Sequence, residues 1–217
     1  KFNSNLIDPI KLTFDRAVFQ KSMQQLIEDE ISRQRDKTAT NVIGYFHQNI
    51  FRYFPNCVVP REGWDVIVTQ KDGTKIYVEM KNKHNTMNAA SSQKTYIQMQ
   101  NQIMQTPNDF CFLVEAIAPC SRNIPWGCSV NKIHCEHAHI RRVSMDQFYA
   151  IVTGETTAFF EMCMQLPKTI EKIVRQNRNL TVQKDTVLEE LQQMHPDLQI
   201  ALYQLAFATY DGFSLLK

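Results

Sequence analysis

A predicted β-hairpin over residues 64–81 constrains this chain more than any other feature of its sequence. Two runs of β-forming residues flank an Asp-Gly pair at positions 72 and 73, and such a pair favours a tight turn. Because side chains alternate between the two faces of a strand, the polar and apolar residues of the second run separate. Its polar face carries Lys75, Tyr77, Glu79 and Lys81. Asp65 on the first run and Glu79 and Lys81 on the second are predicted to bring two carboxylates and one ammonium group together.

These three groups have the chemistry that hydrolysis of a phosphodiester requires. The reaction needs a hard cation held by oxygen ligands, an activated water and positive charge near the phosphate oxygens. Asp65 and Glu79 are predicted to supply carboxylate ligands. The Met80 carbonyl would add a further oxygen, and Lys81 the positive charge. The alternative is a surface hairpin whose charges are simply a solvated face, but the apolar flanking residues and the polar segment that follows favour the metal site.

The same residues resemble the active-site hairpin of the PD-(D/E)XK nuclease superfamily, and within it the type II restriction endonucleases. Asp65 and the run Glu79-Met80-Lys81 match the motif, and the resemblance covers about residues 57–100. Trp64 stands where the superfamily pattern has Pro. The longer run 79–88 is also similar to restriction enzymes that cut sites with GG and CC arms around a central base pair.

The resemblance implies a fold and a function. The fold would be α/β and restriction-endonuclease-like, with a mixed central sheet flanked by helices. The function would be Mg²⁺-dependent, sequence-specific cleavage of double-stranded DNA, with Asp65 and Glu79 as metal ligands and Lys81 orienting the attacking water. A third acidic residue often assists in this superfamily, and the candidates are Glu28, Glu30 and Glu62. The alternatives are a DNA repair or recombination nuclease of the same superfamily and a non-catalytic DNA-binding module.

Two polar segments downstream of the hairpin are candidates for DNA contacts. The first, 82–92, places many hydrogen-bond donors directly after the predicted cation site. The second, 119–142, is a candidate for reading base edges in the major groove, where arginine to guanine is the commonest specific contact. Asn88 is also suited to cap a helix, which is the simpler role. The predicted DNA-contacting residues are Lys83, His84, Asn85, Asn88, Arg122, Asn123, Lys132 and Arg141.

The segment 128–139 also contains four zinc-compatible side chains, namely Cys128, Cys135, His137 and His139. Strand alternation would place the last three on one face, but their spacing matches no established zinc motif and spans too far for easy tetrahedral closure. Base recognition by this segment is the favoured interpretation, and a loop without function is a further alternative. All six cysteines are predicted to be reduced thiols, because a chain of 217 residues needs no disulfide staples.

Periodicity and turn residues predict the remaining elements. A βαβ unit is expected in the middle of the chain, with a right-handed crossover. Its elements are strands at 57–59, 64–70 and 75–81, a helix over 89–105 and a strand over 110–117. The other expected helices are 13–35, 40–53 after a break at 36–40, 145–153 between Ser144 and Gly154, 156–175 with a kink or division at Pro167, 182–194 and 198–209.

Length and charge set the remaining expectations. One nuclease domain is expected over 1–217, with a helical N-terminal segment (1–56), an α/β catalytic core (57–143) and a helical C-terminal segment (144–217). The formal net charge is only +2, so DNA affinity would come from local basic clusters. The absence of a long apolar run or secretion signal predicts no membrane association and a cytoplasmic, prokaryotic protein. A palindromic site would favour a homodimer, and restriction would imply a cognate DNA methyltransferase as genetic partner.

Overall fold

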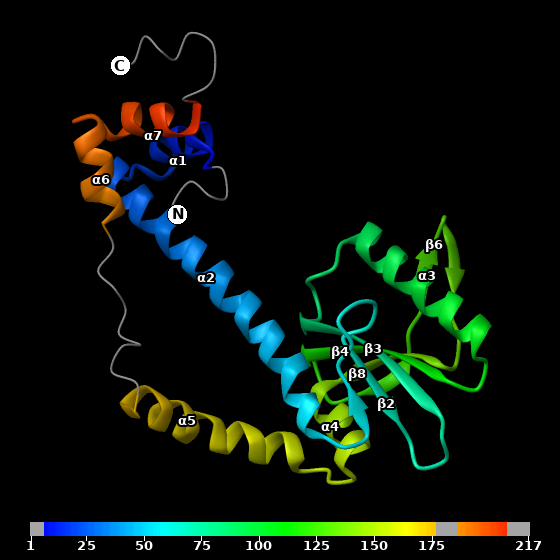
Figure 1. The fold of residues 1–217 in the computed structure, drawn as a ribbon. Coiled ribbons are helices and arrows are strands. Elements are labelled where there is room, and N and C mark those ends of the chain that lie inside the picture. Colours follow the sequence, from blue (N-terminus) through cyan, green and yellow to red (C-terminus); the bar gives the residue numbers. More distant parts are fainter. Residues whose placement is uncertain (1–6, 177–185, 208–217) are drawn as a thin grey trace. The chain divides into compact units, whose positions relative to one another are not determined.

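The computed structural model describes residues 7–176 and 186–207, and the chain forms two compact units (Figure 1). The larger unit comprises Thr40–Arg178, and the smaller one combines Lys1–Ala39 with Asn179–Lys217. Each unit has its own hydrophobic core, built from strands and helices in the larger unit and mostly from helices in the smaller. The predicted catalytic residues all belong to the larger unit.

A mixed sheet forms the centre of the larger unit. Within the described residues, its strands in spatial order are β1 (Cys57–Val58), β2 (Val66–Thr69), β3 (Lys75–Lys83), β4 (Phe110–Ile117), β8 (Ile140–Ser144) and β5 (Asn123–Pro125). The pairs β3–β4 and β4–β8 are parallel, and the other three pairs are antiparallel. A mixed sheet flanked by helices confirms the predicted α/β class and is consistent with a restriction-endonuclease-like fold.

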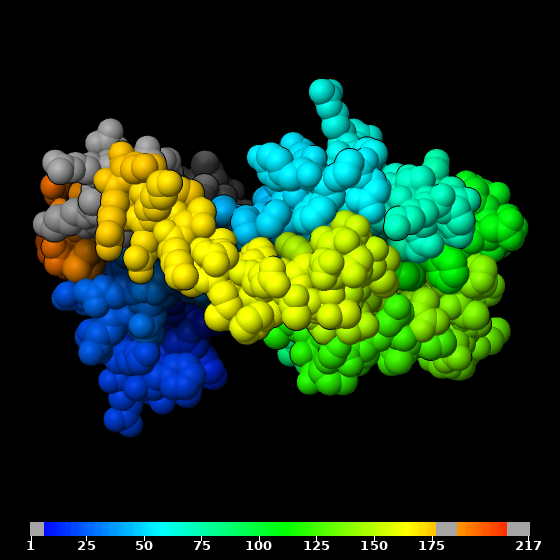
Figure 2. Space-filling view, turned by 90° about the horizontal axis from the view of Figure 1, so that it is seen from below, coloured from blue at the N-terminus to red at the C-terminus, as the bar shows by residue number. Residues whose placement is uncertain are grey.

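Helices cover both faces of this sheet. On β4, Cys111 and Leu113 pack with α3 (Ala89–Gln105), whereas Phe112 and Val114 pack in a cluster with α4 (Met145–Thr153). Alternate residues of one strand therefore define an α3 face and an α4 face. From the α4 side, the yellow-green residues of α4 and the chain around it lie over the middle of the unit (Figure 2).

The β2–β3 hairpin has the alternation that its sequence predicts. Buried and more exposed residues alternate along β3, and the buried set packs in the cluster with α4. At the turn, the Gln70 N–H donates to the Thr74 carbonyl at 2.8 Å, and Gly73 adopts a φ of +88°. Glycine suits this position because a left-handed φ has no steric cost without a Cβ. The residues of the other alternating set, including Glu79 and Lys81, consequently face α3.

The N-terminal helices differ from the prediction. Helix α1 (Pro9–Phe19) begins after the N-cap Asp8 and ends at Gln20, which has a left-handed φ of 52°. Helix α2 (Met23–Asn49) then runs without interruption through the expected break at 36–40. The prediction that two helices, 13–35 and 40–53, are separated by a break at 36–40 was therefore wrong. Residues 36–40 contain neither Gly nor Pro, so nothing in the backbone chemistry ends a helix there. A 3₁₀ helix, η2 (Ile50–Tyr53), follows α2.

The C-terminal helices mostly agree with the prediction. Helix α4 has Ser144 as its N-cap and ends at Gly154, which has a φ of 82°. Helix α5 (Ala158–Gln176) continues through Pro167, so of the two expected effects of this residue, a kink or a division, the division was wrong. Pro removes one backbone hydrogen bond, but α5 has no buried residue, so water can solvate the freed carbonyl. Helices α6 (Val187–Met194) and α7 (Leu198–Phe207) follow, and the parts of the last two predicted helices at 182–185 and 208–209 lie outside the described residues.

Apolar residues from four helical segments form the core of the smaller unit. The buried members are Ile7, Leu12, Met23, Leu26, Ile27, Leu191, Ala201 and Leu202. The leucines of the last two helices therefore serve as core, as the sequence predicts. Among the helices that the structure describes, none has the length and apolar character needed to cross a membrane.

Candidate active site

The structure brings the three predicted catalytic residues together at one end of the β2–β3 hairpin. Asp65 lies in the bend directly before β2, and its N–H donates to the Val78 carbonyl of β3 at 2.9 Å. The Lys81 ammonium donates to Glu79 Oε1 at 2.5 Å. The Met80 N–H donates to Asp65 Oδ2 at 2.7 Å. One antiparallel hairpin thus holds both carboxylates and the ammonium at the same end of the sheet.

Asp65 is the electrostatically least compensated group of the three. Burial raises the pKa of Asp65 to about 6, and the nearby Glu79 carboxylate also raises it, whereas the Met80 N–H and the Lys81 charge lower it. Glu79 and Lys81 are partly accessible, with 19% and 29% of their side chains exposed. A cation placed between two carboxylates would stabilise the ionised form of both.

The donor set fits a hard divalent cation. Carboxylate oxygens are the ligands that Mg²⁺ prefers, and this ion commonly takes only one or two protein carboxylates while keeping water and substrate phosphate in its other positions. Within 7–176 and 186–207, no three His, Cys, Asp or Glu side chains are grouped as a metal site. The Met80 side chain is buried on the other face of the sheet, with 8% exposed.

Gln48, near the end of α2, is a site residue that the sequence did not indicate. Its Nε2 donates to Asp65 Oδ1 at 2.6 Å, so both carboxylate oxygens of Asp65 are held by neutral N–H donors. A glutamine on a polar helix carries no recognisable sequence signal, and only the tertiary fold places it beside Asp65. Two of the acidic candidates are occupied within α2: Glu30 accepts hydrogen bonds from Arg33 and Gln34, and Glu28 accepts one from Gln24. The third, Glu62, lies in the exposed bend before Asp65.

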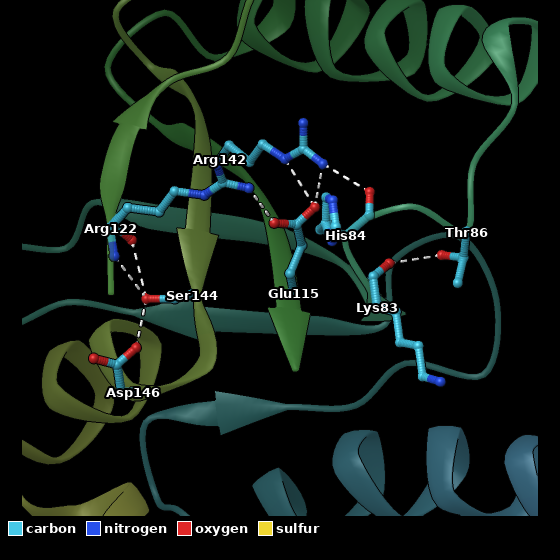
Figure 3. A network of polar contacts seen from close by, with 8 residues as sticks. All are labelled: Lys83, His84, Thr86, Glu115, Arg122, Arg142, Ser144 and Asp146. Atoms are coloured by element: carbon cyan, nitrogen blue, oxygen red, sulfur yellow. Dashed lines mark hydrogen bonds and ion pairs between the residues drawn. The ribbon is translucent and has the colours of Figure 1, made fainter. Parts of the chain in front are cut away.

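A further carboxylate, that of Glu115, is buried on β4, where it contacts Arg122 and Arg142 (Figure 3). The parallel register pairs Glu115 with Lys81 on one side and with Ser144 on the other. Its side chain is only 1% exposed and accepts hydrogen bonds from two guanidinium groups, those of Arg122 and Arg142. One signal in the sequence marks this residue. Glu115 is the single carboxylate in the otherwise apolar strand predicted over 110–117.

The predicted DNA-contacting residues divide into three sets. The first adjoins the β2–β3 hairpin, the second comprises the isolated residues Asn88 and Lys132, and the third lies around β5 and β8. Lys83, His84 and Asn85 are exposed at the end of β3 and in the turn that follows, next to the catalytic hairpin. Asn88 caps α3, because its Oδ1 accepts the Ser91 N–H at 2.8 Å, which confirms the capping role. Lys132 is exposed in the turn between β6 (Cys128–Val130) and β7 (Ile133–Cys135), with a φ of 68°.

The third set, Arg122, Asn123 and Arg141, is divided between the two faces of the sheet. Arg141 Nη2 donates to the Asn123 carbonyl at 2.6 Å, and its Nε also donates to the Asn123 side chain. By strand alternation these two residues lie toward the α4 face, whereas Arg122 joins Glu115 on the α3 face. The structure therefore brings only Arg122 of this set to the face that carries Lys81.

Cys128 and Cys135 lie on a small hairpin rather than on a long strand, and His137 and His139 follow this hairpin. Cys128 and Cys135 are paired across β6 and β7, but β7 ends at Cys135, so the expected alternation through His137 and His139 was wrong. The two histidines follow in a turn, where the His139 N–H donates to His137 Nδ1 at 3.1 Å. The described cysteines form no disulfide, and no metal cluster occurs among the residues that the structure describes.

The mixed sheet, with its two carboxylates and lysine on one hairpin, defines an α/β protein of the restriction-endonuclease-like class. The chain belongs to the Eco47II restriction endonuclease family, whose model matches residues 1–175. Its relatives include the type II restriction enzyme Sau96I of Staphylococcus aureus, which is 31% identical over 186 residues, covering 82% of this chain and 71% of that protein. The type II restriction enzyme Eco47II of Escherichia coli is 29% identical over 189 residues, covering 80% and 75%. The predicted resemblance to type II restriction endonucleases is confirmed.

Proposed function

We propose that this protein is a type II restriction endonuclease that hydrolyses phosphodiester bonds of double-stranded DNA at a short specific site, with Mg²⁺ as cofactor. The observation that carries the proposal is the convergence of Asp65, Glu79 and Lys81 at one end of the hairpin, with Lys81 Nζ 2.5 Å from Glu79 Oε1 and Asp65 Oδ2 2.7 Å from the Met80 nitrogen. The resemblance of this arrangement to a PD-(D/E)XK site supports the proposal. Membership of a family named for restriction endonucleases supports the same activity.

Each residue has a distinct part in the reaction. Asp65, Glu79 and the Met80 carbonyl would hold the ion, which supplies Lewis acidity and lowers the pKa of water. Lys81 orients the attacking water and stabilises the negative charge that develops on the phosphate oxygens. Gln48 and the Met80 N–H fix the orientation of Asp65. The water oxygen forms one new bond to phosphorus as one P–O bond of the backbone breaks, and the departing oxygen takes up a proton.

The proposed site and partners follow from this activity. A palindromic recognition site would be cut by a homodimer, because two-fold symmetry in the DNA matches two-fold symmetry in the protein. Lys83, His84 and Asn85, which lie next to the catalytic hairpin, would contact the DNA. A cognate methyltransferase would protect the host DNA, and its gene would adjoin this one.

Cleavage of defined DNA tests the proposal. The full chain is incubated with mixed-sequence duplex DNA and Mg²⁺, and parallel duplexes carry or lack sites with GG and CC arms around a central base pair. Discrete fragments support restriction, whereas smeared products or cuts only at junctions indicate a repair nuclease. Intact DNA with a band shift indicates a binding module without catalysis. Omission of Mg²⁺ and addition of a chelator are the controls.

A further inference from the structure

The cluster of Glu115, Arg122 and Arg142 has no part in the reaction described above. Glu115 is the one charged residue that is buried among the described residues. Ion pairs with the two arginines offset the free-energy cost of burying its charge. One guanidinium would suffice to neutralise it, yet two are present, so the cluster carries one excess positive charge. The side chains of Arg122 and Arg142 are 18% and 24% exposed, so this charge lies near the surface.

The sheet register places the cluster beside the catalytic residues. Glu115 is the direct neighbour of Lys81 across β3 and β4, and strands in a sheet lie about 4.8 Å apart. Arg142 on β8 is paired with Leu113, which is in turn paired with Glu79. All of these residues therefore belong to the α3 face, and the two guanidiniums continue the row of polar groups that begins at the hairpin.

Glu115 holds the two arginines in a fixed geometry. Arg142 Nε donates to Glu115 Oε1 at 2.8 Å, and Arg142 Nη2 donates both to the same oxygen and to the His84 carbonyl, the latter at 2.8 Å. Arg122 Nη2 donates to Glu115 Oε2 at 2.5 Å. Arg142 thereby ties the turn after β3 to the centre of the sheet (Figure 3).

A donor of Arg142 remains available for a ligand. In Figure 3 the remaining terminal nitrogen of Arg142, Nη1, points away from Glu115, and it makes no hydrogen bond within the described part of the chain. The Nε of Arg122 also has no partner among the described residues, but it is buried and therefore does not face a ligand. Guanidinium groups held in this way are suited to phosphate, because their planar array of donors matches its oxygens.

We propose that Arg142, oriented by Glu115, binds a phosphate of the DNA backbone next to the scissile group, and that Glu115 acts as a positioning residue through it. The inference rests on the proposed function only in that duplex DNA is the ligand. A contact with phosphate adds affinity without sequence information, whereas a contact with a base edge adds discrimination. The two are separable by experiment.

The test measures binding without cleavage. Affinity of the full chain for a cognate and a non-cognate duplex is measured without Mg²⁺ at several salt concentrations, for the wild type, Arg142→Gln and Glu115→Gln. Arg142→Gln should weaken binding to both duplexes about tenfold. It should also reduce the slope of log affinity against log salt by about 1. Lys75→Ala removes the same charge from the other end of β3 and should leave that slope unchanged.

The combination of the two substitutions tests the positioning role. If Glu115 acts through Arg142, the double variant binds DNA no more weakly than Arg142→Gln alone, whereas independent effects would add. Additive losses overturn the role of Glu115.

An unchanged salt slope in Arg142→Gln, or a loss confined to the cognate duplex, overturns the phosphate contact. Circular dichroism confirms folding, and if Arg142→Gln is unfolded, Arg142→Lys replaces it and should keep the slope while losing affinity for both duplexes. Because no cleavage is measured, these outcomes are independent of whether the hairpin is catalytic.

Discussion

Three carboxylates lie on the β2–β3 hairpin and the neighbouring strand β4, and each is compensated in a different way. Glu79 is paired with the ammonium of Lys81, and Glu115 with two guanidiniums. Asp65 receives neutral N–H groups from Gln48 and Met80, and burial raises its pKa to about 6. Asp65 consequently gains most from a nearby cation, whereas Glu115 already has both oxygens engaged. The proposed metal ion would therefore lie between Asp65 and Glu79.

Substitution of the catalytic residues is the most direct prediction at this scale. Asp65→Ala, Glu79→Ala and Lys81→Ala should each reduce cleavage at least about a hundredfold, because each removes a ligand or the charge that stabilises the transition state. Lys81→Ala should retain most of its affinity for DNA. Cleavage is measured on a defined duplex and binding by a gel shift. Wild-type cleavage by any one of these variants would remove that residue from the catalytic role.

Gln48 yields a second prediction. Gln48→Ala removes the donor to Asp65 Oδ1, so the carboxylate is less well oriented toward the ion. We expect cleavage at limiting Mg²⁺ to fall about tenfold and to recover partly as the Mg²⁺ concentration rises. Alanine is a good helix former, so the free energy of unfolding should change little. A large loss of stability with an unchanged Mg²⁺ requirement would show that Gln48 serves the fold instead.

Local spacing explains which site residues the sequence could predict. Asp65, Glu79 and Lys81 lie on one hairpin whose turn and alternation fix their relative positions, so the sequence alone predicts their convergence. Gln48 and Arg142 come from segments far from the hairpin in sequence, and no local pattern relates them to Asp65 or Lys81. Strand alternation also places Arg141 and Arg142 on opposite faces of the sheet. A list of the basic residues in the sequence does not reveal this difference.

At the scale of elements, caps and turns determined the accuracy of the prediction. Helices α3 and α4 have the predicted bounds because Asn88, Ser144 and Gly154 mark their ends. The break expected within α2 had no such residue, and the helix continues. The polar character of 36–40 was mistaken for a helix end, although polar residues continue a solvent-exposed helix as readily as apolar ones.

The cap of α3 gives a prediction for an element. Asn88→Ala removes the acceptor for the Ser91 N–H and should lower the free energy of unfolding by about 1 kcal/mol. Asn88→Ser should retain most of the stability, since Ser is also a good N-cap. Urea denaturation measures both variants. The rate of cleavage under conditions where both are folded should stay near that of the wild type. A loss of cleavage shared by Ala and Ser at unchanged stability would instead assign Asn88 to the DNA.

At the scale of the molecule, a small net charge makes the distribution of charge decisive. With a formal charge of only +2, the chain has no general attraction for DNA, so affinity must come from cationic groups gathered on one face. The α3 face provides them in Lys81, Arg122 and Arg142, and Lys83 follows at the end of β3. Composition predicted the need for such a cluster, but only the sheet register determined which basic residues share a face.

The response of the whole protein to Mg²⁺ follows from the uncompensated charge of Asp65. An ion that binds only the folded protein stabilises it by about 1.4 kcal/mol when its concentration is ten times the dissociation constant. For a chain of this size, that corresponds to a rise in melting temperature of roughly 3 to 6 °C. Calorimetry with Mg²⁺ and with a chelator should show this rise for the wild type and none for Asp65→Ala or Glu79→Ala. Lys75→Ala serves as the control and should respond as the wild type does. An equal rise in all four proteins would mean that Mg²⁺ binds elsewhere, and the two carboxylates would then lose their assignment as ligands.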